Sequence, residues 1–245
     1  DYSCFNISGS KKLNGSQVLK ENISYILNSL KSSILTQEKY KTILHIFNSK
    51  SVLDGKVIEN LPVGLFGDYY NHELTFFMIK NNDLKNIKQI FNKSNINIKK
   101  IFLKNFVEGT QLIEKDRTVE TFFKINIDNN FSSISFFDNS SLRYSENFKF
   151  GTQIIYKDIS KICSLDTETI NFFLSEINFD LTNFKDSEVI EEKYFSAGKF
   201  RKIRKKLIYE VSIARIEEIC DLIFKKNINL NYLKKKGVKI YVSIK

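Results

Sequence analysis

Residues 121–160 constrain the fold of this chain more than any other stretch. Three short runs with the composition of β-strands, at residues 122–128, 131–138 and 142–150, are separated by tight polar turns. Runs of this length, joined by such turns, predict a β-meander. Gly151 follows the third run and leads into a segment with helical spacing. The stretch therefore predicts a sheet whose last meander strand enters a helix through a glycine.

The composition indicates a folded chain and defines no partner by itself. Of 245 residues, 42% are hydrophobic and 22 are phenylalanine, which argues against disorder. No apolar run approaches the roughly 20 residues that span a bilayer, and no secretory signal is visible. The three cysteines are widely spaced, as expected for buried, reduced thiols in a cytosolic protein. The net charge of +10 comes from diffuse lysines, a pattern that does not favour nucleic-acid binding.

Hydrophobic periodicity in the first block predicts a small α+β unit. The expected order is strand, helix, strand, strand, at residues 2–8, 18–34, 42–47 and 56–59. Ser16 is the expected N-cap of the helix. Residues 60–67, rich in turn formers, are the expected connector to the next block.

The second block has the pattern of an α/β protein. A strand at 73–79, a helix capped by Asp83 and a strand at 96–103 predict a βαβ crossover, which implies a parallel sheet. After the meander we expect helices at 154–162, 167–174 and 200–226, an irregular stretch at 177–196 and a last strand at 238–244. The fold class predicted from these patterns is α/β with an α+β insert.

Four short segments carry a resemblance to a known family. They are Ile7-Ser8-Gly9, the connector at 60–67, Gly151 with Asp158-Ile159-Ser160, and Arg215-Ile216-Glu217-Glu218-Ile219. In this order they resemble the strand that opens the inserted subdomain, the N-P-x-G-x-x-G connector, the first helix of the second half and the R-x-x-E-I segment of the FtsA family. That family comprises bacterial cell-division proteins of the actin superfamily, and the resemblance covers nearly the whole chain.

The resemblance implies an incomplete actin-like ATPase fold with the strand-helix-strand-strand inserted subdomain of FtsA. We expect the inserted subdomain at 1–72, the remainder of the first subdomain at 73–116, the second-half core at 117–161 with 205–245, and a small fourth subdomain at 162–204. A glycine-rich loop would precede the chain. An adenosine loop and a membrane-anchoring amphipathic helix would follow it, so the resemblance implies the middle of a longer protein.

The second phosphate loop of the family, D-I-G-G-G-T-x-D, matches residues 126–133 without its glycines. Those glycines let backbone N–H groups approach phosphate oxygens closely. Asparagines can still form the hairpin because they tolerate positive φ, but Asp128 would place a carboxylate near the phosphate, and Asn126 replaces a carboxylate used with magnesium. The vestigial nucleotide-binding residues implied by the resemblance are Asn126, Asp128, Asn129, Asn130, Ser133 and Gly151. We therefore expect that the chain is not an enzyme and requires no cofactor. Binding of ATP and magnesium by a longer, complete protein stays open. An active actin-like ATPase is the alternative.

The remaining candidate residues, two histidines and two pairs of acidic residues, are expected to have structural roles. His45 and His72 lack partners with metal-ligand spacing and are expected to be satisfied structural histidines. Asp166 with Glu168, and Glu191 with Glu192, are expected to be solvated carboxylates instead of acid/base pairs. We predict no catalytic residue and no metal site.

A basic cluster around the start of the long helix is the predicted partner site. Its residues are Lys199, Arg201 and Arg204, joined by Arg215, which matches a family arginine near the docking site. The resemblance implies that they bind the acidic-hydrophobic C-terminal tail of FtsZ, that actin-like subdomains self-associate, and that residues 1–72 contact other division proteins. It also implies a cytoplasmic location at the inner face of the plasma membrane at the division site, with membrane contact through the missing C-terminal helix. The alternatives are a membrane-surface module that uses the same cluster and a merely solvated basic face.

Overall fold

The computed structural model of the chain describes residues 2–176, 187–195, 200–231, 233 and 237–244. It separates into two compact units, which are described in turn. Unit 1 comprises Asp1–Ile125, Ser133–Asn147 and Gly237–Val242, and unit 2 comprises Asn126–Ser132, Phe148–Lys236 and Ser243–Lys245. The subdomain ranges expected from the sequence stay a prediction.

A four-stranded antiparallel sheet forms the first layer of unit 1. Its order is β1 (Tyr2–Lys12), β4 (Tyr69–Lys80), β2 (Lys41–Leu53) and β3 (Lys56–Ile58). The strand-helix-strand-strand order predicted for this block is confirmed, although β1 continues past Gly9, where we expected it to end. A Cβ at Gly9 would lie 2.9 Å from Cγ2 of Ile26, so glycine lets the helix lie close to the strand.

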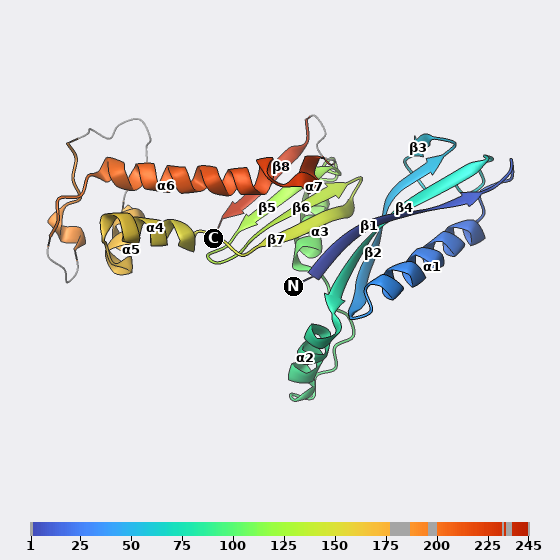
Figure 1. Ribbon diagram of the computed structural model, residues 1–245, viewed down its shortest axis with the longest axis horizontal. Coiled ribbons are helices and arrows are strands. Elements are labelled where there is room, and N and C mark those ends of the chain that lie inside the picture. The colour runs from blue at the N-terminus through green and yellow to red at the C-terminus, as the bar shows by residue number, and fades with distance from the viewer. Residues whose placement is uncertain (1, 177–186, 196–199, 232, 234–236, 245) are drawn as a thin grey trace. The chain divides into compact units, whose positions relative to one another are not determined.

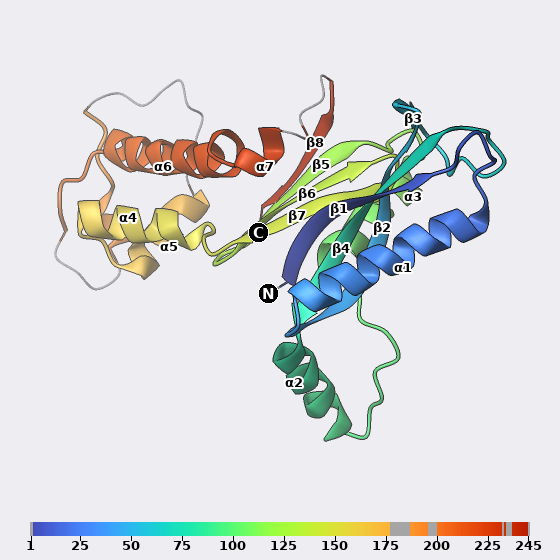
Figure 2. The ribbon, with the colours of Figure 1, turned by 45° about the vertical axis from the view of Figure 1, so that its right-hand side comes forward.

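Helix α1 (Lys20–Gln37) covers one face of this sheet, as Figures 1 and 2 show. Its buried residues Ile26, Leu30 and Ile34 pack in one cluster with alternate residues of β4, among them Leu74, Phe76 and Met78. Ser16 is not the N-cap, because the helix begins at Lys20. The backbone N–H of Leu19 donates instead to Oδ1 of Asn22, at 2.7 Å, and this bond caps the helix from within its first turn.

The predicted βαβ crossover is wrong. Strand β4 is antiparallel to β1 on one side and to β2 on the other, so no edge of it is left for a parallel partner. Residues 96–103 form no strand. Helix α2 (Asn81–Asn92) is present, but Asp83 lies in its first turn, and Lys80 occupies the N-cap position.

The predicted meander is confirmed by the second sheet. Strands β5 (Phe122–Ile127), β6 (Ser132–Asp138) and β7 (Ser141–Phe148) are neighbours in sequence order, and β8 (Lys239–Ile244) pairs with β5. In unit 1, Phe77 of the first sheet packs in one buried cluster with Phe122, Phe137 and Leu142 of the second.

Helix α3 (Lys104–Lys115), which the periodicity did not predict, packs on the same cluster. A Cβ at Gly109 would lie 2.0 Å from Cζ of Phe137. That ring is fully buried and stacks on Phe122 at 4.8 Å, so it has no room to move away. The absence of a side chain at Gly109 is therefore what allows α3 to approach the sheet.

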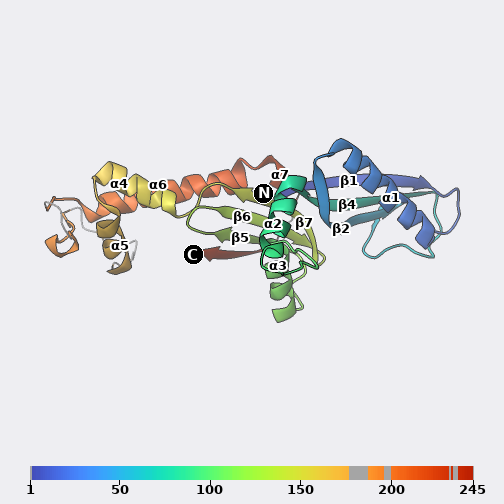
Figure 3. The same cartoon turned by 90° about the horizontal axis from the view of Figure 1, so that it is seen from below.

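Unit 2 contains a helical body. Its elements are α4 (Gln153–Cys163), α5 (Thr167–Glu176), the 3-10 helix η1 (Glu192–Tyr194), α6 (Lys205–Cys220), the π-helix η2 (Asp221–Lys225) and α7 (Ile228–Asn231). Helices α4 and α6 lie side by side (Figures 1 and 3). They share a buried cluster that includes Ile159, Ile170, Phe173, Ile190 and Ile208.

The long helix starts at Lys205, later than the predicted start at Phe200. The backbone preceding it is extended, because the N–H of Ile190 donates to the carbonyl of Ile203 at 2.8 Å and the N–H of Lys205 donates to the carbonyl of Glu188 at 2.9 Å. Part of the irregular stretch expected at 177–196 lies outside the described residues. No helix among the described residues is long and apolar enough to cross a bilayer.

The cysteines are free, as expected, but they differ in burial. Cys163 is buried and Cys4 is partly buried, whereas Cys220 is exposed, so the expectation of burial is wrong for Cys220. Burial raises the pKa of the Cys4 thiol to about 12, which keeps it protonated at neutral pH.

His72 makes the stability of unit 1 sensitive to acid. The side chain is 1% exposed, and neither ring nitrogen has a hydrogen-bond partner among the described residues, so the expectation of a satisfied histidine is wrong here. Burial lowers the pKa of His72 from its ordinary value of 6.5. A histidine in the unfolded chain therefore binds a proton at higher pH than folded His72 does, and protonation favours unfolding.

We predict that the free energy of unfolding falls as the pH drops below about 6.5, and that His72→Leu removes much of this loss. The measurement is urea unfolding of both proteins across that pH range. His45, whose pKa is also lowered by burial, is present in both proteins and cancels in the comparison. Parallel pH profiles for the two proteins would contradict the assignment of this acid sensitivity to His72.

Candidate functional site

Residues 126–132 of the hairpin that matches the phosphate loop belong, with Gly151 and α4, to unit 2. The loop between β5 and β6 is closed by the N–H of Asp128, which donates to the carbonyl of Phe131 at 2.9 Å. Next to it, the Ser132 hydroxyl donates to the carbonyl of Phe150 at 2.8 Å and so joins the hairpin to the segment that precedes the helix.

Two carbonyls of the hairpin accept hydrogen bonds from the beginning of α4. The N–H of Thr152 donates to the carbonyl of Asp128 at 3.1 Å, and the N–H of Gln153 donates to the carbonyl of Asn129 at 2.9 Å. The Thr152 hydroxyl also donates to Oδ1 of Asn129, at 3.0 Å. The first N–H groups of a helix otherwise lack partners and are a common anion site. Here the hairpin backbone occupies two of them.

Gly151 is required for this contact. A Cβ at this position would lie 1.9 Å from the carbonyl oxygen of Asp128 and 2.6 Å from that of Asn129. Both obstacles are backbone atoms, which cannot rotate aside as a side chain does. Gly151 therefore contributes by allowing the hairpin to touch α4, a role different from approach to a phosphate.

The predicted loop residues differ in their exposure. Asn126 is buried, Asp128 is half-buried, and Asn129 and Asn130 are exposed. Neither of these two asparagines is among the described residues with positive φ, so the loop closes without the left-handed conformation that we expected of them. The hairpin needs no glycine at either position.

Ser133 lies in unit 1 and contributes to a buried polar cluster there. Its hydroxyl donates to Oδ1 of Asn105 on α3, at 3.3 Å. The Asn105 amide in turn donates to the Tyr2 hydroxyl at 3.0 Å and to the Ser145 hydroxyl at 2.9 Å. Burial raises the pKa of Tyr2, which keeps this hydroxyl protonated at neutral pH. The arrangement of Ser133 is that of a structural residue in a hydrogen-bonded core.

The predicted partner site is only partly open to a ligand. Lys199 lies outside the described residues. Arg201 and Arg204 are exposed, and within the described part of the chain neither has an ion-pair partner. Phe200, next to them, is 39% exposed and packs against Phe195 with ring centroids 5.4 Å apart. This end of unit 2 therefore presents guanidinium groups beside an aromatic ring.

Arg215 is engaged within unit 2. Its Nε donates to Oδ2 of Asp158 on α4, and one terminal nitrogen donates to Oε2 of Glu218 at 2.5 Å. The hydrogen bond to Asp158 raises the pKa of Arg215 further above its usual value. The two segments that resemble FtsA on α4 and α6 thus contact each other, and Arg215 joins the helices.

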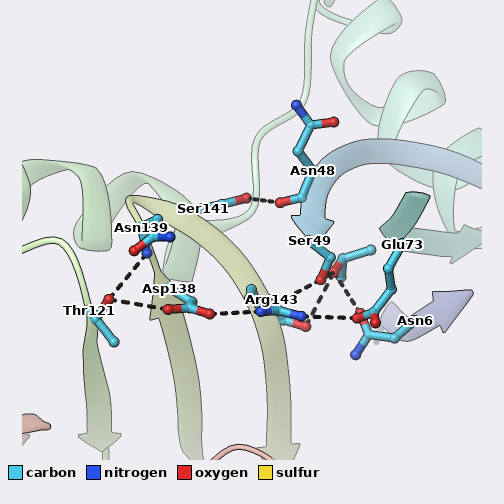
Figure 4. Close-up of polar contacts among 10 residues, drawn as sticks. Asn6, Asn48, Ser49, Glu73, Thr121, Asp138, Asn139, Ser141 and Arg143 are labelled. Atoms are coloured by element: carbon cyan, nitrogen blue, oxygen red, sulfur yellow. Dashed lines mark hydrogen bonds and ion pairs between the residues drawn. The ribbon is translucent and has the colours of Figure 1, made fainter. Parts of the chain in front are cut away.

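Arg143, a charged residue of unit 1 with several partners, has no signal in the sequence. Arg143 on β7 donates to Oδ2 of Asp138 at 2.7 Å, to Oε1 of Glu73 at 3.0 Å and to the Ser49 hydroxyl at 2.8 Å (Figure 4). The side chain of Asp138 is 6% exposed. Because Glu73 and Ser49 are far from Arg143 in sequence, no spacing rule points to the cluster. It joins β7 to β4 and β2.

The other candidate side chains have structural roles. Asp166 accepts the backbone N–H of Thr169 at 2.8 Å and the Thr169 hydroxyl at 2.8 Å, in the manner of a helix cap. The bond from the Thr169 N–H lowers the pKa of Asp166. Glu191 pairs with exposed Lys193 at 3.2 Å.

Nε2 of His45 accepts the N–H of Leu103 at 3.4 Å. Among the described residues, no three His, Cys, Asp or Glu side chains are grouped to hold a metal.

Comparison with known proteins identifies the fold. No protein-family model and no curated protein sequence matches the chain. Among solved structures, the PilM-PilN type IV pilus biogenesis complex matches with a TM-score of 0.57 and 6% identity, over 98% of this chain and 59% of that chain. The chain thus spans about three fifths of the matched protein. It has an actin-like ATPase fold, as the resemblance of the four motif segments implied.

Two further structures have lower similarity. MreB 5 of Spiroplasma citri bound to AMPPNP matches with a TM-score of 0.46 and 13% identity, over 67% of this chain and 54% of that chain. Diol dehydratase-reactivating factor in nucleotide-free form matches with a TM-score of 0.39 and 10% identity, over 91% of this chain and 42% of that chain.

The contact between hairpin and α4 predicts the effect of a single methyl group. Gly151→Ala places a Cβ against two backbone carbonyls, so we expect it to lower the free energy of unfolding by about 2 kcal/mol or more. Asn130→Ala, at the exposed tip of the same hairpin, is the control and should change it by about 0.5 kcal/mol or less. Urea unfolding measures both. Equal stability of the two variants would show that the contact does not have the geometry described.

Proposed function

We propose that the chain is an actin-like assembly scaffold, which docks partner proteins and does not turn over ATP. One observation carries the part of this proposal that concerns ATP: the N–H groups of Thr152 and Gln153 donate to the carbonyls of Asp128 and Asn129. In a phosphate-binding loop, N–H groups of this kind face the ligand. Here two N–H groups at the start of α4 donate to carbonyls of the hairpin instead of facing a ligand.

The exposed basic end of unit 2 supports the docking half of the proposal. Arg201 and Arg204 are exposed beside the partly exposed ring of Phe200. A peptide with carboxylates and apolar anchors is complementary to such a surface in charge and in hydrophobicity. Arg215 acts differently in this proposal. Its ion pair with Asp158 holds α6 against α4 and so positions the surface.

The specific role that we propose is that of an FtsA-like division protein. In this role Arg201 and Arg204 bind the C-terminal tail of FtsZ, residues 1–72 contact other division proteins, and the protein works in the cytoplasm at the division site on the inner face of the plasma membrane. The four motif segments support this assignment. The likeness to PilM, solved in complex with PilN, supports partner docking in general and does not single out FtsZ.

The docking proposal predicts a loss of tail binding on charge reversal. The double variant Arg201→Glu with Arg204→Glu should weaken binding of an FtsZ C-terminal tail peptide by about tenfold or more, because two attractive charges become repulsive. Fluorescence anisotropy with a labelled peptide measures the affinity. The matched control reverses Lys157 and Lys161, which are exposed on α4, and gives the same change in net charge.

Equal weakening in the control would mean that only net charge matters, and it would contradict a defined docking surface. Absence of binding by the unmodified protein would reject FtsZ as the partner. Sedimentation with anionic liposomes, lost in the Arg201 and Arg204 variant while peptide binding persists, would favour the alternative that this cluster binds lipid.

The nucleotide proposal predicts that calorimetry with Mg-ATP detects no binding tighter than about 1 μM, for this chain or for any longer protein that contains it. The double variant Asn129→Gly with Asn130→Gly should not restore binding, because the N–H groups of Thr152 and Gln153 remain bonded to backbone carbonyls. Submicromolar affinity in the unmodified protein would overturn the proposal. Binding that appears only in the glycine variant would assign the defect to side chains.

A further inference from the structure

Residues 81–102 of unit 1 form an amphipathic segment in which no residue is fully buried. Helix α2 has apolar residues at Leu84, Ile87, Ile90 and Phe91, a spacing that places them on one helix face. None of the residues of α2 is buried, whereas α1 and α3 both bury residues in the cores of unit 1. Figures 1 and 2 show α2 extending from the end of β4, away from the sheet.

Four apolar side chains of the segment are open to solvent, whereas Leu84 and Ile87 on α2 are half-buried. Ile90 is 66% exposed and Phe91 is 44% exposed, and beyond the helix Ile96 and Phe102 are 52% and 54% exposed. Scattered single apolar residues on a surface need no explanation, but a group of them on an amphipathic helix marks an interaction site. The C-terminal part of the apolar face of α2, at Ile90 and Phe91, therefore lacks the packing that normally stabilises such a helix.

Both ends of α2 are nevertheless fixed. At its start, the N–H of Asn81 donates to the carbonyl of Tyr40 at 2.9 Å, and the Thr42 hydroxyl donates to Oδ1 of Asn81 at 2.7 Å. At its end, Asn95 has φ of 57°, and the N–H of Ile96 donates to the carbonyl of Phe91 at 3.0 Å. This is the geometry of a Schellman motif, which frequently brings its last apolar residue onto the helix face. The exposed helix is thus well defined.

The charge of the segment points to the occupant. Its five lysines are all exposed, and no ion pair within the described residues involves them: Lys85, Lys88, Lys93, Lys99 and Lys100. The one acidic residue from 81 to 103 is Asp83. A helix with an apolar face and lysines around it, which projects from its domain, matches the properties of helices that lie in the interface of anionic membranes.

We propose that α2 and the residues after it, up to Phe102, bind the surface of an anionic lipid membrane. The apolar face of α2 enters the boundary between headgroups and acyl chains, with Ile90 and Phe91 inserted, and the lysines contact lipid phosphates. At 12 residues α2 is too short to span a bilayer, so it lies along the surface. This surface is distinct from the basic cluster of unit 2 and is independent of the function proposed above.

The absence of tryptophan from the chain permits a direct test of insertion. Phe91→Trp introduces a single fluorophore on α2, and Phe66→Trp introduces one at another exposed position of unit 1. The probes are vesicles of phosphatidylcholine alone and of equal parts phosphatidylcholine and phosphatidylglycerol. In the Phe91→Trp variant we expect a blue shift of the tryptophan emission, and its quenching by brominated acyl chains, with the anionic vesicles only. The Phe66→Trp variant should show neither effect.

Charge and insertion are separated by two further variants in vesicle sedimentation. Ile90→Asp with Phe91→Asp, and Lys85→Glu with Lys88→Glu, should each lower binding to anionic vesicles by about tenfold or more. The controls are Val57→Asp, at an apolar residue that is 61% exposed on β3, and the Lys157 and Lys161 reversal on α4. Because the α2 residues are not buried, circular dichroism and thermal unfolding should show that the variants stay folded.

The proposal is overturned if the chain does not sediment with anionic vesicles, or if the α2 variants bind as well as their controls. It is also overturned if the emission of the Phe91→Trp variant is unchanged while the protein sediments, because contact would then occur elsewhere on the surface. Retention of an acidic protein on α2 without vesicle binding would assign the face to a protein partner and reject the lipid.

Discussion

The contact between Gly151 and the hairpin is the constraint on which our functional interpretation of this actin-like fold depends. Two helix N–H groups and two hairpin carbonyls form hydrogen bonds within unit 2, and only glycine permits their approach. The contact satisfies backbone groups at the start of α4 that would otherwise need water, a side chain or a ligand. The same bonds that stabilise the fold therefore occupy two donors that an anion could otherwise bind.

Charged side chains reinforce each unit in a similar way. Arg143 in unit 1 contacts Asp138, Glu73 and Ser49, and it ties β7 to strands of the other sheet. Arg215 in unit 2 ties α6 to α4 through Asp158. Partly buried arginines of this kind contribute little net stability compared with apolar packing, but removing either partner leaves a charge that is costly to bury. They specify which elements are neighbours within each unit.

The parts of the fold that depend on local pattern could be predicted from the sequence. The meander at 122–150 and the strand-helix-strand-strand block were confirmed, because period-2 and period-3.6 patterns reflect burial on one face. The pairing direction of β4 was predicted wrongly, since an apolar strand carries no information about which strands flank it. For the candidate site, Gly151 could be found from its place after the meander. The roles of Thr152 and Gln153 could not, because backbone donors have no side-chain signature.

The error at β4 also concealed the character of α2. A helix between two strands of a parallel sheet would bury Leu84, Ile87, Ile90 and Phe91 against that sheet, and these residues would then need no other partner. Once β4 is flanked by β1 and β2, and residues 96–103 form no strand, Leu84 and Ile87 are only half-buried, and Ile90 and Phe91 remain exposed. The free energy that normally holds an amphipathic helix of this length in place comes from its apolar contacts. An anionic membrane surface would supply these apolar contacts and attract the surrounding lysines. It would therefore account for both the apolar face and the lysines of α2.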